Sequence, residues 1–67
     1  MVVCKNGFLK FTAIGKDAAA YEALLSLARI ESISLQQGRN YISLIDDGGS
    51  VESKDSIEDL FNAILGE

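Results

Sequence analysis

The side chains of this chain that are best suited to chemistry are carboxylates near its C-terminal end. The stretch SVESKDSIEDLFNAILGE closes the sequence, and acidic residues crowd its first half. Grouped carboxylates can transfer protons, hold a cation or attract a basic partner. If they share one face of the fold, the acidic residues from position 46 to 59 form a negative patch. These residues are Asp46, Asp47, Glu52, Asp55, Glu58 and Asp59.

The same carboxylates also suit the start of a helix. Asp55 with Glu58, or Ser56 with Asp59, has the spacing of a capping box, in which side chains bond the unpaired amides of the first turn. Acidic residues there also complement the helix dipole. Capping therefore accounts for these residues without a ligand, and we favour it over a functional patch.

Enzymatic chemistry has little support in the sequence. The chain has no histidine and one cysteine, Cys4, so it offers neither a Ser-His-Asp nor a Cys-His arrangement and no zinc cluster. The run Asp46-Asp47-Gly48-Gly49 lacks the alternating ligands and closing glutamate of a calcium loop, and we predict a glycine-rich turn there. We expect no enzymatic activity, no metal and no cofactor.

Composition limits the fold and the partners. The 67 residues predict one small domain, 1–67, with 48% hydrophobic residues and a net charge of −4. The acidic balance argues against binding nucleic acid or an anionic membrane surface. No segment is long and apolar enough to cross a bilayer, and the start lacks a secretory signal, so we expect a cytoplasmic protein. A domain of this size has a small core, and self-association would bury more apolar surface.

The N-terminal half predicts strands and then a helix. VVC is a short strand, and Asn6-Gly7 is a strong hairpin signal before the strand GFLKFTAIG. Apolar residues alternate in that strand and place three side chains on one face: Leu9, Phe11 and Ala13. KDAAAYEALLSLAR, residues 16–29, predicts a helix, because Asp17 suits its N-cap, alanines favour it and an apolar stripe begins at Tyr21.

The C-terminal half predicts a three-stranded meander and a second helix. RIESISLQ and NYISLID are strands joined by a turn at Gly38, and the second has apolar residues on both faces, as in a central strand. DDGGS is a turn, and SVES is a return strand. A final helix carries an apolar stripe and ends near Gly66, which suits a left-handed helix end. The stripe consists of Ile57, Leu60, Phe61 and Ile64.

These elements predict an α+β fold. We expect a small antiparallel sheet of three to four strands, a C-terminal helix packed on one face and a short helix after the first strand. Either the second strand of the meander or the N-terminal strand should lie at an edge of the sheet, where it could pair with another chain.

From about Ala28 onward, the sequence resembles the small FlbD-like proteins associated with flagella. RIESI, YISLIDDGG and VESKDSIEDL follow the family's order of a strand with an I-E-x-I element, a hairpin, a glycine turn and a strand leading into a helix. The resemblance covers residues 28–65. The predicted helix at 16–29 is longer than the family's connection. The resemblance implies a shape and a binding role rather than an enzymatic one.

Two functions follow from these observations. The first is a small non-enzymatic protein-interaction module that binds a protein partner or a second copy of itself. Phe8 and Tyr21 would be its exposed aromatic anchors, although both residues could instead pack in the core. The second is an acidic inhibitor or nucleic-acid mimic, of phage or mobile-element type, that binds a host or regulatory protein. Salt separates the two, because it weakens charge pairing far more than apolar contact.

Overall fold

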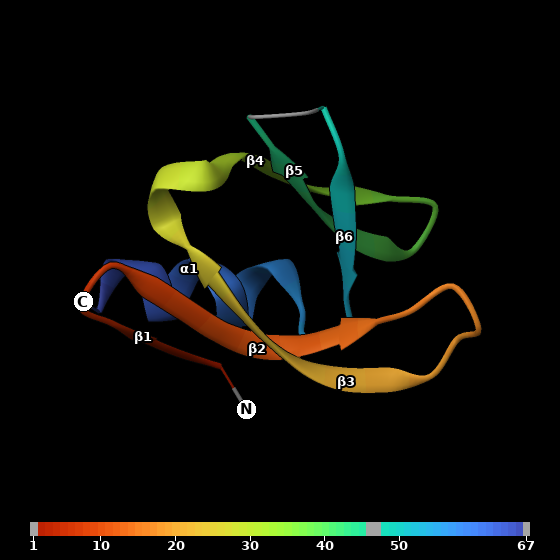
Figure 1. Ribbon diagram of the computed structural model, residues 1–67, viewed down its shortest axis with the longest axis horizontal. Helices are drawn as coiled ribbons and strands as arrows, with labels where there is room; N and C mark the ends of the chain where they lie inside the picture. The colour runs from red at the N-terminus through yellow and green to blue at the C-terminus, as the bar shows by residue number, and fades with distance from the viewer. Residues whose placement is uncertain (1, 46–47, 67) are drawn as a thin grey trace.

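A computed structural model describes residues 2–45 and 48–66 as an α+β fold (Figure 1). One antiparallel sheet of six strands is followed by a C-terminal helix. In chain order the elements are β1 (Val3–Lys5), β2 (Phe8–Ile14), β3 (Ala20–Ser26), the 3-10 helix η1 (Leu27–Arg29), β4 (Ile30–Gln36), β5 (Arg39–Leu44), β6 (Ser50–Ser53) and α1 (Ile57–Leu65).

Strand β2 joins the two parts of the sheet, because three strands pair with it. Strand β3 runs along one edge of β2 over its whole length. The opposite edge is shared, since β1 pairs with the first three residues of β2 and β6 pairs with Ala13 and Ile14. From β6 the sheet continues through β5 to β4, and Figure 1 shows this second part turning away from the direction of β2.

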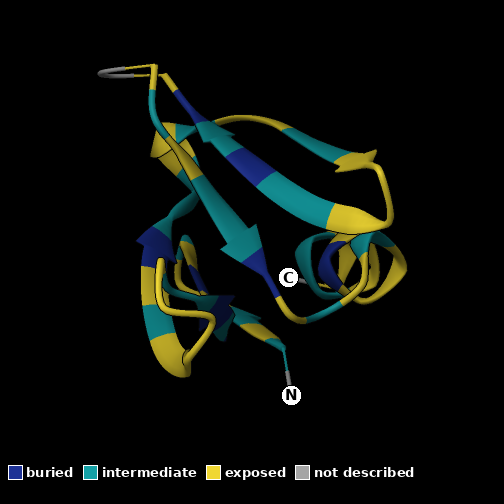
Figure 2. Cartoon of the chain, turned by 90° about the vertical axis from the view of Figure 1, so that its right-hand side faces the viewer, coloured by how far each residue is buried: buried dark blue, intermediate teal, exposed yellow. Residues whose placement is uncertain are grey.

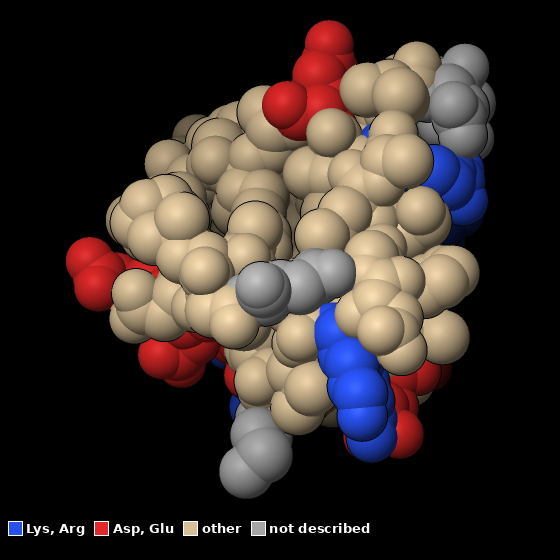
Figure 3. Space-filling view, turned by 90° about the vertical axis from the view of Figure 1, so that its left-hand side faces the viewer, with Lys and Arg blue, Asp and Glu red and all other residues tan. Residues whose placement is uncertain are grey.

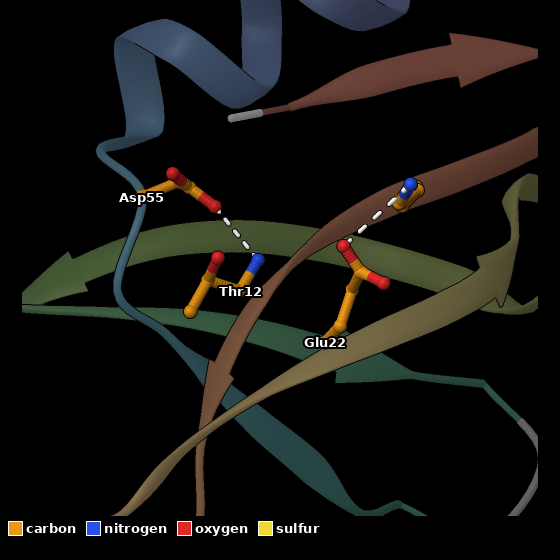
Figure 4. A network of polar contacts seen from close by, with 4 residues as sticks. Thr12, Glu22 and Asp55 are labelled. Atoms are coloured by element: carbon orange, nitrogen blue, oxygen red, sulfur yellow. Dashed lines mark hydrogen bonds and ion pairs between the residues drawn. The ribbon is translucent and has the colours of Figure 1, made fainter.

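Thr12 lies on the shared edge of β2, between the residues that pair with β1 and those that pair with β6. The Lys54 amide donates to the Thr12 carbonyl at 2.8 Å, and the Thr12 amide donates to Oδ2 of Asp55 at 2.8 Å. Figure 4 shows Asp55 reaching from the loop before α1 toward β2. The Ser53 hydroxyl, which is buried, donates to the Asp55 carbonyl at 2.9 Å and holds the same loop. The Asp55 side chain therefore supplies a hydrogen-bond partner to the edge of β2 at Thr12, where neither β1 nor β6 pairs with the strand.

The start of α1 is capped and also tied to the sheet. Oγ of Ser56, the N-cap residue, accepts from the Asp59 amide at 3.1 Å. This confirms the second of the two spacings predicted for a cap, because Asp55 bonds to β2 instead. Asn40 on β5 supplies Oδ1 to the Ile57 amide at 3.2 Å. The first turn of the helix is thus fixed relative to the middle of the sheet.

The core lies between the bent sheet and the inner side of α1. Figure 2 shows buried segments on the strands and on one side of the helix, while the turns are exposed. The buried apolar side chains are Leu9, Phe11, Ala13, Leu25, Ile42, Leu44 and Leu60. The alternation predicted for β2 is confirmed. A core of this size leaves large apolar side chains at the surface.

The helix predicted for residues 16–29 is wrong, because this segment forms β3 and η1. Tyr21, Ala23 and Leu25 alternate on the face that β2 turns toward the core, and the intervening residues face outward. Without β3, the backbone groups along one whole edge of β2 would have no strand partner. Pairing along that edge outweighs the helix propensity of the alanines, which differs from that of other residues by less than about 1 kcal/mol per residue.

The turn before β3 shows why the predicted helix cap does not form. Oδ1 of Asp17 accepts from the Ala19 amide at 3.0 Å, two residues later, and Ala18 has a left-handed φ of 66°. Backbone hydrogen bonds between Gly15 and the two residues Ala18 and Ala19 close the turn. Asp17 therefore stabilises a reversal of the chain rather than the first turn of a helix.

The structure confirms the predicted turns at Asn6-Gly7 and at Gly38. It does not confirm the predicted number of strands or the prediction of an edge at the second strand of the meander. Asn6 and Gly7 have φ of 55° and 82°, and Gln37 and Gly38 have φ of 53° and 78°, as type I′ turns require. The sheet has six strands, not three to four. Strand β5 pairs on both sides, as predicted for a central strand, so the second strand of the meander is not an edge. The two ends of the strand path are β1 and β4. Gly66 has φ of −76°, so its predicted left-handed conformation is wrong.

Replacing Asp55 with Ala should lower the free energy of unfolding by about 1.5–3 kcal/mol, because the partly buried Thr12 amide loses a charged acceptor. Urea denaturation measures this difference. Asp59→Ala is the matched control, since the Asp59 side chain is exposed and its removal should cost less than about 1 kcal/mol. Equal losses in the two variants would show that the bond to Thr12 does not hold the junction together.

Candidate functional site

A hollow between β4 and α1 is lined mainly by apolar side chains. Its volume is about 320 Å³. Leu35 extends it along β4, because Leu35 lies opposite Asn40, whose side chain reaches the start of α1. We term this surface the edge groove. It consists of Leu35 together with the residues that line the hollow, namely Ile33, Ile57, Glu58, Phe61 and Ile64. Glu58 is its one charged residue, so the groove suits apolar side chains of a protein better than a polar ligand.

Phe61 is the aromatic residue of the edge groove, and 58% of it is exposed. The preceding residue, Leu60, is fully buried, and Ala63 and Ile64 pack against the core. The apolar stripe of the helix predicts that Phe61 is buried too, but the sheet covers only part of that stripe. Exposed aromatic residues are enriched at protein interfaces. The sequence pattern therefore does not mark Phe61 as a candidate binding residue.

The strand beside the groove has a free edge. Strand β4 ends the sheet path and pairs with β5 alone among the described strands. Gln36 and Arg39 flank a two-residue turn and form a hydrogen-bonded pair, and such pairs alternate along an antiparallel ladder. The backbone groups of Ile33 and Leu35 therefore point away from β5.

Little in β4 protects this edge against pairing with another strand. The strand contains no lysine and no proline, which commonly block edges. Its irregularity is limited to the register shift between Ile30 and Ser32, at its start. The remaining length is regular and can accept hydrogen bonds from an added strand.

The two predicted aromatic anchors lie on different faces of the sheet. Phe8 is 47% exposed and Tyr21 is 51% exposed. Phe8 shares the outer face of β1, β2 and β3 with Val3 and Leu24, while Tyr21 extends from the face that carries the core. The outer face also carries an ion pair, in which Lys10 Nζ lies 3.5 Å from Glu22 Oε2 (Figure 4). The structure therefore does not bring the two anchors together.

Of the six predicted acidic residues, Glu52 is the one that the structure places on β6. It lies 3.9 Å from a guanidinium nitrogen of Arg39, and its side chain is only 19% exposed. Asp46 and Asp47 lie outside the described residues. Glu52 is thus partly neutralised by a neighbouring cation.

The other three acidic residues lie around the start of α1 without sharing one hollow. Asp55 and Asp59 line a hollow beside Val2, whereas Glu58 lines the edge groove. The face shown in Figure 3 carries its acidic side chains in separate groups near the rim, around a broad uncharged area. On this face the acidic residues do not form one continuous patch.

The described residues offer little for catalysis or metal binding. In residues 2–45 and 48–66, no group of three His, Cys, Asp or Glu side chains could hold a metal ion. Every buried side-chain nitrogen or oxygen in this part of the chain has a hydrogen-bond partner. A hollow of about 480 Å³ is lined by polar residues, namely Gln36, Gln37, Tyr41, Ser43 and Ser50. Among the helices described, none combines the length and apolar character needed to traverse a bilayer.

Comparisons with known proteins returned no match, whether to family models, to curated proteins or to solved structures. The resemblance to FlbD-like proteins therefore stays a prediction that rests on the residues quoted for it.

Replacing Phe61 with Ser should lower the free energy of unfolding by about 1 kcal/mol, because more than half of its side chain is exposed. The adjacent Leu60→Ala variant should lose about 2–5 kcal/mol, since Leu60 is fully buried. Denaturant titration of both variants tests the assignment. A large loss for Phe61→Ser would place its ring in the core and remove it from the candidate surface.

Proposed function

We propose that this chain is a small non-enzymatic protein-interaction module that receives its partner along the edge groove. One observation carries the proposal, namely that a free strand edge and an exposed aromatic side chain lie on the same side of the fold. Neither feature alone marks a binding site. Together they supply both kinds of contact that a partner strand needs.

Addition of a strand to β4 fits this surface physically. The outward backbone groups of Ile33 and Leu35 would give hydrogen bonds to an extended partner segment. The partner's alternate side chains would then face the hollow, where Phe61 supplies a large apolar surface. Backbone pairing provides affinity in this mode of recognition, and the hollow provides specificity.

The acidic inhibitor or nucleic-acid mimic has less support. Such a function needs several carboxylates free on one continuous surface. Asp55 is engaged with Thr12, Glu52 lies beside Arg39, and Glu58 lines a different hollow from Asp59. These arrangements favour structural roles for Asp55 and Glu52 over recognition of a basic partner.

Affinity capture with the tagged chain tests the proposed module. Wild type, Phe61→Ser and Phe8→Ser are compared in nuclease-treated lysate at low and high salt, and bound proteins, including untagged copies of the chain, are identified by mass spectrometry. We expect the wild-type chain to retain its partner at high salt, because salt does not screen apolar contacts. The Phe61→Ser variant should lose that partner.

Phe8→Ser is the matched control, since Phe8 is also exposed but lies on the other face of the sheet. It should retain the partner. Binding that disappears in high salt would favour the acidic-face function instead. A partner lost with Phe8→Ser and kept with Phe61→Ser would move the site to the outer face.

A further inference from the structure

We infer that the occupant of the edge groove is a second copy of this chain, joined by antiparallel pairing of the two β4 strands across a two-fold axis. The inference rests on the proposed function and names its partner. It follows from the symmetry of the β4 sequence, the place of its one charge and the small size of the core.

The sequence of β4 is compatible with pairing to itself. Ser32-Ile33-Ser34 reads the same in both directions, so antiparallel pairing centred on Ile33 sets Ile33 against its own copy. Each Ser32 then lies opposite the partner's Ser34, so the three central positions pair like with like. This register also uses the backbone groups of Ile33 and Leu35 that point away from β5, as a hydrogen-bonded ladder requires.

The charges of β4 permit the same arrangement. Glu31 is the only charged residue of the strand and lies near one end. Antiparallel pairing centred on Ile33 therefore separates the two Glu31 carboxylates, and each lies opposite Leu35 of the other copy. Directly opposed like charges would destabilise the pair. Strand β3 also has a free edge, but Glu22 lies next to its centre, where self-pairing would bring the two carboxylates close together.

Pairing through β4 would also cover apolar surface that one copy leaves exposed. Leu35 and Phe61 are each 58% exposed and lie beside this edge. A two-fold axis perpendicular to the sheet at Ile33 would place the grooves of both copies on the same side of one continuous sheet. The contact is isologous, so it closes at two copies. A domain with a small core gains most from such burial.

Sedimentation equilibrium of the full chain, over a wide range of concentration, tests the inference with three variants. Wild type should show twice the mass of one chain. Leu35→Glu should weaken the dimer roughly tenfold or more, because it removes a leucine that the dimer would bury and opposes the partner's Glu31. Leu35→Lys should weaken it less, because its cation would face that carboxylate. Leu24→Glu is the control, since Leu24 is 68% exposed on the outer face and its replacement should leave the dimer unchanged.

Each contrary result is decisive. A wild-type chain that stays monomeric, or a dimer that Leu24→Glu dissociates and Leu35→Glu does not, would overturn the inference. Equal weakening by Leu35→Glu and Leu35→Lys would overturn the register centred on Ile33. Salt provides a separate test, because each chain has a net charge of −4 and high salt screens the repulsion between two copies. The dimer should therefore not dissociate at high salt.

Failure of this inference can be separated from failure of the proposed function. A monomer that captures another protein, and loses it with Phe61→Ser, would refute the second copy and support the module. If none of the groove variants changes either the captured proteins or the mass in solution, both the inference and the proposed function are refuted. Circular dichroism of each variant confirms that the comparison is between folded chains.

Discussion

The hydrogen bond between the Thr12 amide and the Asp55 carboxylate sets how the two parts of this fold meet. Strand β2 must pair with β1 at one end of an edge and with β6 at the other, and Thr12 lies between them. Lys54 and Asp55 satisfy its backbone groups there. Because α1 begins two residues after Asp55, the same junction also aims the helix across the sheet. The distance between α1 and β4, and therefore the shape of the edge groove, depends on this short segment.

Features with a local cause were predictable from the sequence. The Asn6-Gly7 turn requires two residues that tolerate positive φ, and few other dipeptides do so. The alternation in β2 and the spacing in α1 report directly which side of each element is apolar. The segment that forms β3 is different, because its alanines and leucines also satisfy a helical pattern. What decides its structure is the open edge of β2, which lies outside the segment and which no local pattern reveals.

The candidate site depends even more on distant contacts. Asp55 has the spacing of a capping residue, yet its bond reaches a residue 43 positions earlier in the chain. Phe61 belongs to a regular apolar stripe, and the sequence does not say how much of that stripe the sheet will cover. Residue type indicates Phe8 and Tyr21 as possible exposed anchors but leaves core packing open for both, and their placement on opposite faces follows from the register of β2 with β3. Residue type and spacing thus indicate which side chains are unusual, while topology decides which of them act together.

The length of α1 connects the core of this protein to its surface. The helix has nine residues, and its inner side already contacts β1, β2 and β4. A helix this short cannot also cover the apolar groups along the outer edge of β4, so Leu35 and Phe61 remain exposed beside unpaired backbone. An added strand would cover this edge most directly, because a strand satisfies the backbone groups and the apolar side chains at once.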